Sequence, residues 1–541
     1  MELLEQRNIR GASKTGEDAD TSKLPISAIS LLVLTASVSL AWSHYRLLFR
    51  DEFWEMWTDR VSTIGQILHI QRTVPVALDP IAYHILGHVS IQAFGANAFA
   101  LRLPALFSIL LMQICLFVFV RRISTDRTAI FAMGLPVLTY VMGYSMEGRP
   151  YGLVLGCFGL AMVCWQTAAR RESERTLALI ALAVVVAVAL NTQYFAILLL
   201  VPLCVAEVFR AYQRKRLDIP IIASLAGGSA GILLVIPFMK AAKEFHTSYG
   251  IGLLSPKQIV WAYVWTLANH PSSMLDRVLF GVLGLTLCTS LWGYWRERRG
   301  KPILSYQPED IFLLALAALP FFGFLVALFT SPVLEPRFVI GLVIGIAALA
   351  AMGLFSLLSS DRSEKLALRV LFAAIALTGV SHIWLEHNAA KRMLASMNLQ
   401  PAVRAALIAR PEETLNVQDL ECFAFLSLYD HDPEVHSRLR LLYSTNEEIK
   451  WNHESVTGLS ALHLHDFANV RIVSYENLKA QPGEHLVLDF AEPSIRMGRP
   501  RYWNWIGFAL RNDHAEVHLL GNAFQDNADV PGDLLLVNFH P

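Results

Sequence analysis

A few charged side chains interrupt an otherwise apolar chain, and their types suit chemistry at a phosphate group. Asp51 and Glu52 stand side by side directly after the first long apolar run, and Arg149 and Arg337 follow later runs. An arginine stays ionised and binds two phosphate oxygens with its planar guanidinium. A carboxylate nearby can accept a proton from a hydroxyl. The pattern therefore predicts transfer of a group that is carried on a phosphate.

Other charged residues fall in the same set of gaps between apolar runs. They are Asp79, Lys240, Lys243, His246, Glu147 and Glu335. A single charged residue at the end of a membrane helix is more often a solvated residue, or one that extends to the membrane surface, than a functional one. The functional interpretation therefore depends on whether these gaps lie on one side of a membrane.

The segments between these gaps have the length and composition of membrane spans. Of the 541 residues 54% are hydrophobic and 17% are charged, and the mean hydropathy of +0.43 is above the range of soluble globular proteins. About 20 apolar residues cross a bilayer. We therefore predict an α-helical polytopic membrane protein with about eleven transmembrane helices. The runs span 24–42, 103–120, 128–144, 150–168, 176–190, 194–209, 219–238, 275–295, 311–330, 338–358 and 366–384.

The first run, 24–42, is long enough to be a retained helix rather than the apolar part of a signal peptide. The mixed-charge segment 1–23 before it is then expected in the cytoplasm. Net charge is zero, so no basic excess argues for a nucleic-acid partner. Five of the six cysteines lie in apolar runs, which argues against a disulfide framework and against a cysteine metal site.

Arginine and lysine set the orientation, because they cluster in every second gap. The clusters lie at 121–127, 170–175, 210–216, 296–301 and 362–369, which the positive-inside rule assigns to the cytoplasm. This alternation holds only if segment 80–95 is an interfacial helix and not a span. The segment 52–70 is predicted to be another such helix, with one apolar stripe. The remaining gaps, and everything from about 386, are then extracytoplasmic.

His84, His88 and Gln92 recur at helical spacing in segment 80–95. Two histidines four residues apart on a helix could share a metal ion. With no third ligand in view, we favour a polar helix face, and the transfer chemistry requires no metal and no cofactor.

Longer stretches resemble a known family. RDEFWEMWTDR (50–60) resembles the acidic motif of the GT-C class of membrane glycosyltransferases, in particular the superfamily of protein O-mannosyltransferases and lipid A aminoarabinose transferases. LDPIAYHILGHVSIQAFGANAFALRLPALFSILLMQICLFVFVRR (78–122), MEGRPYGLVLGCF (146–158) and LEPRFVIGLVIG (334–345) resemble further motifs of that superfamily. The resemblance covers about 25–385. It departs from the family at Asp79–Pro80, where a double proline is usual, and at Phe338, where tyrosine is common.

The resemblance implies an inner-membrane enzyme that takes a sugar from a polyprenyl-phosphate donor. The sugar passes to a lipid, glycan or protein hydroxyl outside the cytoplasm. By that likeness Asp51 is the catalytic carboxylate and Glu52 supports it. The residues expected to bind the donor phosphate or substrate are Arg149, Tyr151, Arg337, Glu147, Asp79 and His246.

The alternative to an enzyme is a transporter or flippase of a lipid-linked sugar. Transport sites usually lie near mid-membrane and use ionisable residues or broken helices there. The predicted spans are nearly free of charge away from their ends, which favours an enzyme that works at one surface.

From about 386 to 541 the composition turns polar and predicts a small extracytoplasmic α/β domain. Segments 421–428, 484–490, 515–521 and 532–539 are predicted strands, whereas 431–444 and 501–513 look helical. We favour a stabilising cap over an acceptor-binding domain. The whole organisation is thus a leader (1–23), a membrane domain (24–385) and this outer domain.

Overall fold

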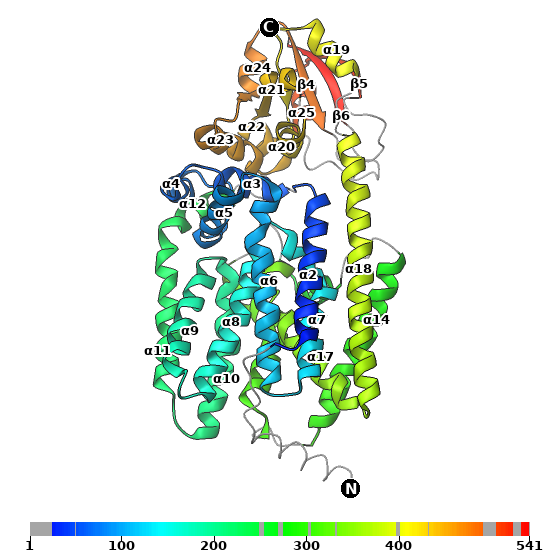
Figure 1. Ribbon diagram of the computed structural model, residues 1–541. Helices are drawn as coiled ribbons and strands as arrows, with labels where there is room; N and C mark the ends of the chain where they lie inside the picture. The colour runs from blue at the N-terminus through cyan, green and yellow to red at the C-terminus, as the bar shows by residue number, and fades with distance from the viewer. Residues whose placement is uncertain are drawn as a thin grey trace.

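The computed structural model describes residues 24–48, 50–247, 254–268, 274–300, 305–330, 333–396, 401–430, 432–490, 505–522 and 532–539. These residues form a long helical bundle with a smaller sheet-containing unit at one end (Figure 1). Short helices lie across that end of the bundle, beneath the sheet unit (Figure 1). The protein is therefore organised along one axis, with two unlike ends.

Every predicted apolar run is helical in the structure, and one further helix, α13 (Lys257–Leu267), lies in the gap 239–274 that was expected to be a loop. The helices are α2 (Ile26–Tyr45), α6 (Ala98–Arg121), α7 (Asp126–Gly134), α8 (Tyr151–Arg170), α9 (Arg175–Leu190), α10 (Leu200–Arg214), α11 (Ile219–Ser229), α12 (Ile236–His246), α13 (Lys257–Leu267), α14 (Met274–Arg298), α15 (Pro308–Ala317), α16 (Leu319–Thr330), α17 (Leu342–Leu357) and α18 (Asp361–Ser396). Short 3-10 segments extend several of them, among them η2 (Tyr140–Met146), η3 (Tyr194–Leu199) and η6 (Pro336–Val339).

Five helices in the described part of the chain are long and apolar enough to cross a membrane. Three further pairs qualify if each bent pair is one span, which gives up to eight. The bends are 75° between α7 and η2, 57° between α11 and α12, and 56° between α15 and α16. Helices α9 and α17 are apolar but shorter. The structure is thus that of a helical membrane protein, and the number of eleven spans stays a prediction.

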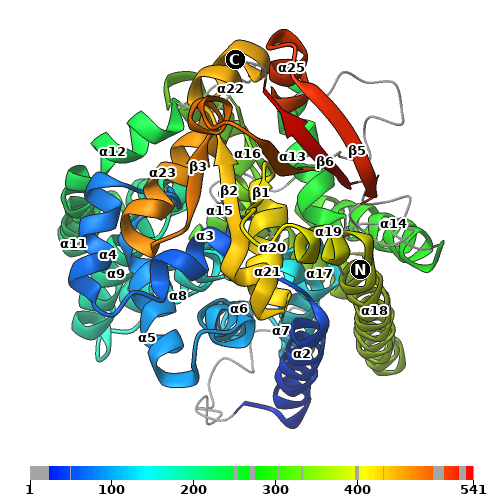
Figure 2. The same ribbon diagram turned by 90° about the horizontal axis from the view of Figure 1, so that it is seen from above.

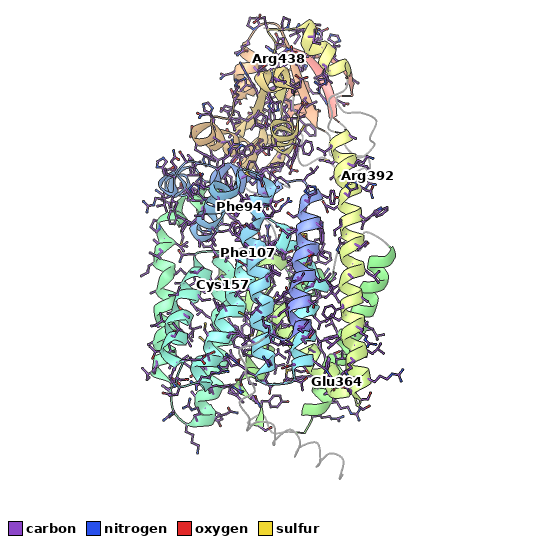
Figure 3. The ribbon with its side chains drawn as sticks, viewed as in Figure 1. Phe94, Phe107, Cys157, Glu364, Arg392 and Arg438 are labelled. Carbon is purple, nitrogen blue, oxygen red and sulfur yellow. The ribbon has the colours of Figure 1, made fainter. Side chains whose placement is uncertain are left out.

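The outer faces of the bundle are apolar, as contact with lipid requires. Phe107 on α6 is 61% exposed and extends from the bundle (Figure 3). At the end away from the sheet, Arg127 of α7 donates a hydrogen bond of 2.8 Å to Glu364 of α18 (Figure 3). Charged pairs therefore mark the end of the bundle, and apolar side chains cover its length.

Helices α6 and α8 pack unusually closely, and this contact fixes the start of α8. Gly152, Gly156 and Gly159 lie on one face of α8. A Cβ atom at Gly152 would lie 2.8 Å from the carbonyl oxygen of Ala105, and one at Gly156 2.9 Å from that of Ser108. Small residues at such spacing let helix backbones approach in a membrane. The turn before α8, which carries Arg149, is held against α6 as a result.

Three short helices cross the sheet-side end of the bundle: α3 (Arg50–Asp59), α4 (Ile64–Thr73) and α5 (Ile81–Phe94). The predicted helix at 80–95 is confirmed as a helix. The prediction of one continuous helix over 52–70 is wrong, because the chain breaks between α3 and α4. Thr63 Oγ1 accepts a hydrogen bond from the Gln66 N–H, and the Gln66 side-chain oxygen accepts one from the Thr63 N–H, so this capping box starts a new helix.

The C-terminal unit is built on a six-stranded sheet of order β3-β2-β1-β4-β6-β5. Its strands are β1 (Leu415–Val417), β2 (Leu439–Tyr443), β3 (Ile472–Ser474), β4 (Glu484–Phe490), β5 (Glu516–Asn522) and β6 (Gly532–Asn538). The strands β1 to β4 pair in parallel, whereas β4–β6 and β5–β6 pair antiparallel. Its helices are α19 (Pro401–Ala409), α20 (Leu420–Tyr429), α21 (Pro433–Arg438), α22 (Thr445–Asn452), α23 (Val456–Ala468), α24 (Tyr475–Ala480) and α25 (Trp505–Asn512).

The prediction of a small α/β unit is confirmed, with two corrections inside it. Strands at 484–490, 515–521 and 532–539 and the helix near 505–512 are present. The predicted strand at 421–428 is helix α20, because Asp419 caps its start and a short run that is apolar throughout fits either element. The predicted helix at 431–444 ends at Arg438, and the chain continues as β2.

The C-terminal unit docks on the short helices. The Tyr429 hydroxyl accepts a hydrogen bond of 2.9 Å from the Leu48 N–H, and His463 Nδ1 donates one of 2.7 Å to the Pro75 carbonyl. Phe53 and Trp57 of α3 share one apolar core with residues of α20 and α23. Seen from above, α23 lies next to α3, and α4 and α5 extend beyond the C-terminal unit (Figure 2). The unit therefore covers part of this end of the bundle.

Cysteine labelling tests the orientation that the arginine and lysine clusters predict. Gln92 is exposed on α5 at the sheet-side end, whereas Glu172 follows the far end of α8. In sealed right-side-out vesicles, an impermeant maleimide should label a cysteine at 92 and spare one at 172. Equal labelling of both before the membrane is opened would contradict the orientation, and labelling of both afterwards is the control for reactivity.

Candidate active site

Helix α3 places Asp51 and Glu52 in its first turn, at the end of the bundle. Consecutive helical residues point about 100° apart, so the two carboxylates meet different partners. Asp51 Oδ2 lies 3.0 Å from Arg149 Nη1 and 3.6 Å from Arg337 Nη1. Its side chain is 37% exposed. Three residues that the sequence analysis took from distant gaps thus meet at one place.

Glu52 is buried and tied to Arg102 on α6. Arg102 Nε and Nη2 each donate to a Glu52 carboxylate oxygen at 2.7 Å, and the Gly148 N–H donates to Oε1 at 2.7 Å. Burial alone would raise the pKa of Glu52, but the charge and hydrogen bonds of Arg102 hold it below its usual value. With 1% of its side chain exposed, Glu52 positions the site and does not face a substrate.

Arg149 lies at the centre of a group of side chains that also comprises Asp51, Glu55, Asp79, Tyr151 and Arg337. Its Nη1 contacts Asp51 and lies 3.9 Å from Glu55, while its Nη2 lies 3.2 Å from Asp79. Arg149 Nη2 also donates a 3.0 Å hydrogen bond to the Tyr151 hydroxyl, and the guanidinium stands over the Tyr151 ring. Its Nε atom is buried and donates to no acceptor among the described residues.

Arg337 enters the same place from η6, between α16 and α17. Its guanidinium lies over the rings of Tyr151 and Phe338, at 5.9 and 5.8 Å from their centroids. Phe338 itself stacks on Phe195 with centroids 4.0 Å apart. Phenylalanine in place of the family's tyrosine therefore keeps an aromatic surface for Arg337. The Nε atom of Arg337, like that of Arg149, has no acceptor in the part of the chain that is described.

The other predicted residues divide between the group and its surroundings. Asp79 joins the group through Arg149. Glu147 instead pairs with Arg46 at 3.2 Å, and its burial raises its pKa. His246 is exposed in the last turn of α12, next to Phe245, which packs on His463 of the C-terminal unit. The placement of His246 gives its predicted role no support, and that role stays a prediction.

Sequence reasoning missed two sets of residues. Arg102 lies inside a motif quoted above, but its partner Glu52 is 50 residues away and no local pattern links them. Glu55 and Asp59 follow Asp51 at intervals of four, so all three lie on one face of α3. This spacing was the available signal for a carboxylate row.

The inner end of that row meets His84 of α5. Burial raises the pKa of Glu55 well above its usual value and also raises that of Asp59. Burial opposes protonation of His84, but the two carboxylates raise its pKa to about 9. His84 was predicted on a polar face of an interfacial helix. The structure buries it completely between α3 and α5.

Known proteins resemble this chain in sequence and in fold. Residues 79–239 match the family described as dolichyl-phosphate-mannose-protein mannosyltransferase. Over 270 residues the chain is 27% identical to undecaprenyl phosphate-alpha-4-amino-4-deoxy-L-arabinose arabinosyl transferase 2 of Proteus mirabilis (strain HI4320). That alignment covers 46% of this chain and 45% of the relative, so less than half of the relative is matched.

The fold is similar over nearly the whole chain to that of ArnT from Cupriavidus metallidurans. The crystal structure of ArnT bound to undecaprenyl phosphate has a TM-score of 0.55 and 12% identity, covering 94% of this chain and 97% of that one. The apo form gives a TM-score of 0.52 at 13% identity, covering 94% and 98%. The chain is thus similar to these transferases in sequence over part of its length and in fold over nearly all of it.

Proposed function

We propose that the protein transfers a sugar from a polyprenyl-phosphate-linked donor to an acceptor hydroxyl at the extracytoplasmic surface of the inner membrane. The observation that carries this proposal is the pair of arginines around Asp51. Arg149 and Arg337 each keep a buried Nε–H without an acceptor among the described residues, while both contact one carboxylate. Such donors suit a phosphate that has yet to bind.

The location of the group also fits a lipid-linked donor. Asp51 follows the end of α2, Arg149 precedes the start of α8, and Arg337 lies between α16 and α17. All three therefore stand at helix ends, where we expect the lipid headgroups. A donor whose tail stays in the bilayer presents its phosphate there. A mid-membrane transport site would require the charges further along the helices, so this placement favours transfer over transport.

Relatives support the same substrate class. The Proteus mirabilis relative is named as a transferase that uses an undecaprenyl phosphate-linked aminoarabinose, and the similar ArnT structure is bound to undecaprenyl phosphate. We infer a polyprenyl phosphate-linked sugar as donor for this chain. The matched family is described as mannosyltransferases and the relative as an arabinosyl transferase, so both sugar classes belong in the first assay.

The mechanism follows from the ion pairs. Before donor binds, Asp51 occupies the two arginines. The donor phosphate takes over those contacts, which releases the Asp51 carboxylate. The acceptor oxygen then forms a bond to the sugar carbon as that carbon's bond to the phosphate oxygen breaks, and Asp51 takes the hydroxyl proton. Arg149 and Arg337 stabilise the charge that gathers on the departing polyprenyl phosphate.

Replacement of Asp51 by asparagine separates catalysis from donor binding. Asp51→Asn removes the base but keeps the size of the side chain, so turnover should fall by about 10²–10⁴-fold. Donor affinity should stay equal or rise, because the arginines lose a competing carboxylate. Transfer rates and donor binding are measured at matched expression, with Asp466→Asn, an exposed aspartate of the C-terminal unit, as control. A fully active Asp51→Asn enzyme would remove Asp51 from the mechanism.

The neighbouring residue should behave differently. Glu52→Gln breaks a buried ion pair, and such a loss costs about 3–5 kcal/mol of stability. Asp51→Asn is the matched control, because its pair is partly exposed and should cost about 1 kcal/mol or less. Thermal unfolding in detergent, followed by tryptophan fluorescence, compares the two. If Glu52→Gln unfolds at the wild-type temperature yet loses turnover, Glu52 acts in the chemistry and not as an anchor.

Arg337→Ala should weaken donor binding as well as turnover. The phosphate contact exists in both the ground state and the transition state, so its loss raises the donor KM and lowers kcat/KM. Arg392→Ala is the control, since Arg392 is an exposed arginine near the sheet-side end of α18 (Figure 3). Unchanged donor affinity in Arg337→Ala, with Arg392→Ala also unchanged, would show that Arg337 does not bind the donor phosphate.

A further inference from the structure

We propose that Glu55, Asp59 and His84 form a binding site for one divalent metal ion of the zinc type, between α3 and α5. One ligand atom from each residue lies within 4.8 Å of the others, and all three residues are buried. The site goes beyond the proposed transfer reaction, because metal binding can be measured without donor or acceptor.

The ligand atoms already converge. His84 Nδ1 lies 2.7 Å from Asp59 Oδ1 and 3.1 Å from Glu55 Oε2. Two ligands at about 2.1 Å from a tetrahedral zinc ion are about 3.4 Å apart. The two contacts of His84 therefore need to lengthen by less than about 1 Å to admit an ion.

Several carboxylate oxygens of this cluster lack a hydrogen-bond donor. Neither oxygen of Glu55 and only one oxygen of Asp59 accepts a hydrogen bond within the described residues, although both side chains are fully buried. The single Nδ1–H of His84 is directed at Asp59 and cannot serve Glu55 as well. Buried carboxylates without donors are costly unless they are neutralised or bind a metal.

The nearest guanidinium does not satisfy Glu55. Arg149 approaches to 3.9 Å, but it is shared with Asp51 and Asp79. Arg149 thus divides its charge among three carboxylates, and Arg337 contacts only Asp51 of the three. A divalent ion between Glu55 and Asp59 would balance this negative charge at the place where it is least solvated.

The surroundings hold the ligands as metal sites usually do. His84 Nε2 lies 2.8 Å from Gln71 Nε2. With the Gln71 amide turned so that its oxygen faces the ring, the Nε2–H group would donate to that oxygen and leave Nδ1 free for a metal ion. Gly87 of α5 makes room for Asp59, because a Cβ atom there would lie 2.0 Å from Asp59 Oδ2. His88 Nδ1 donates to the Asp59 carbonyl at 2.9 Å and fixes the end of α3.

One imidazole and two carboxylates favour zinc or a similar ion such as Co²⁺ over Ca²⁺, which takes six to eight oxygen ligands. The alternative way to neutralise the cluster is a proton shared among the three side chains. The two accounts differ in one measurable property, since only the first includes stoichiometric uptake of metal.

Metal titration of the full-length protein separates them. Tag-free protein in detergent is treated with a chelator, freed of it, and titrated with Zn²⁺ by calorimetry and with Co²⁺ by visible absorption. Wild type should bind one equivalent. Glu55→Gln and His84→Gln should weaken binding by more than about 10–100-fold, the loss that follows removal of a mere outer-shell partner.

Two controls distinguish the loss of a metal ligand from misfolding of the variant. Glu448→Gln replaces a buried glutamate of the C-terminal unit, which accepts a hydrogen bond from Gly458, and should bind metal as wild type does. Glu55→Gln without metal should unfold no lower than metal-free wild type, because it removes an unsatisfied charge. Absence of one-equivalent uptake by wild type, or wild-type affinity in folded Glu55→Gln, would overturn the site and leave the proposed transfer reaction untouched.

Discussion

The buried pair of Glu52 and Arg102 is the interaction on which the catalytic end of the protein depends. Arg102 holds the Glu52 carboxylate through two hydrogen bonds and also donates to the carbonyls of Ser43, Arg46 and Leu47. Those carbonyls belong to the end of α2 and to the segment that leads into α3. One side chain of α6 therefore fixes where the first span stops and where α3 begins.

The fixed start of α3 determines which partners the Asp51 side chain can reach. Because Glu52 also accepts from the Gly148 N–H, the turn that carries Arg149 is placed relative to the start of α3. Asp51, in the first turn of α3, then meets Arg149. A buried, fully paired carboxylate beside a partly exposed, exchangeable one gives the two adjacent acids different properties. Glu52 is therefore held in place, whereas Asp51 can change partners when a phosphate binds.

The sequence was sufficient for the features that repeat or that interrupt a strong pattern. Apolar runs predicted the helices, and rare charges between them predicted that Asp51, Arg149 and Arg337 would meet. The sequence was insufficient where the structure or burial of a segment depends on contacts with residues far away in the chain. The segment 421–428 fits a strand or a helix equally, and burial of His84 follows from packing against α3 rather than from its own helix pattern. The Glu52–Arg102 pair likewise leaves no local trace.

Helical spacing places the exchangeable carboxylate, Asp51, in line with the buried carboxylates Glu55 and Asp59. Asp51, Glu55 and Asp59 descend one face of α3 from partial exposure to full burial, and Arg149 reaches the first two. Any positive charge that binds at Glu55 withdraws that carboxylate from Arg149. The guanidinium then has one fewer internal partner and stronger attraction for an external anion, since Coulomb interactions are long-ranged where water is excluded. Occupation of the buried end of α3 would thus increase the affinity of the exposed end for phosphate.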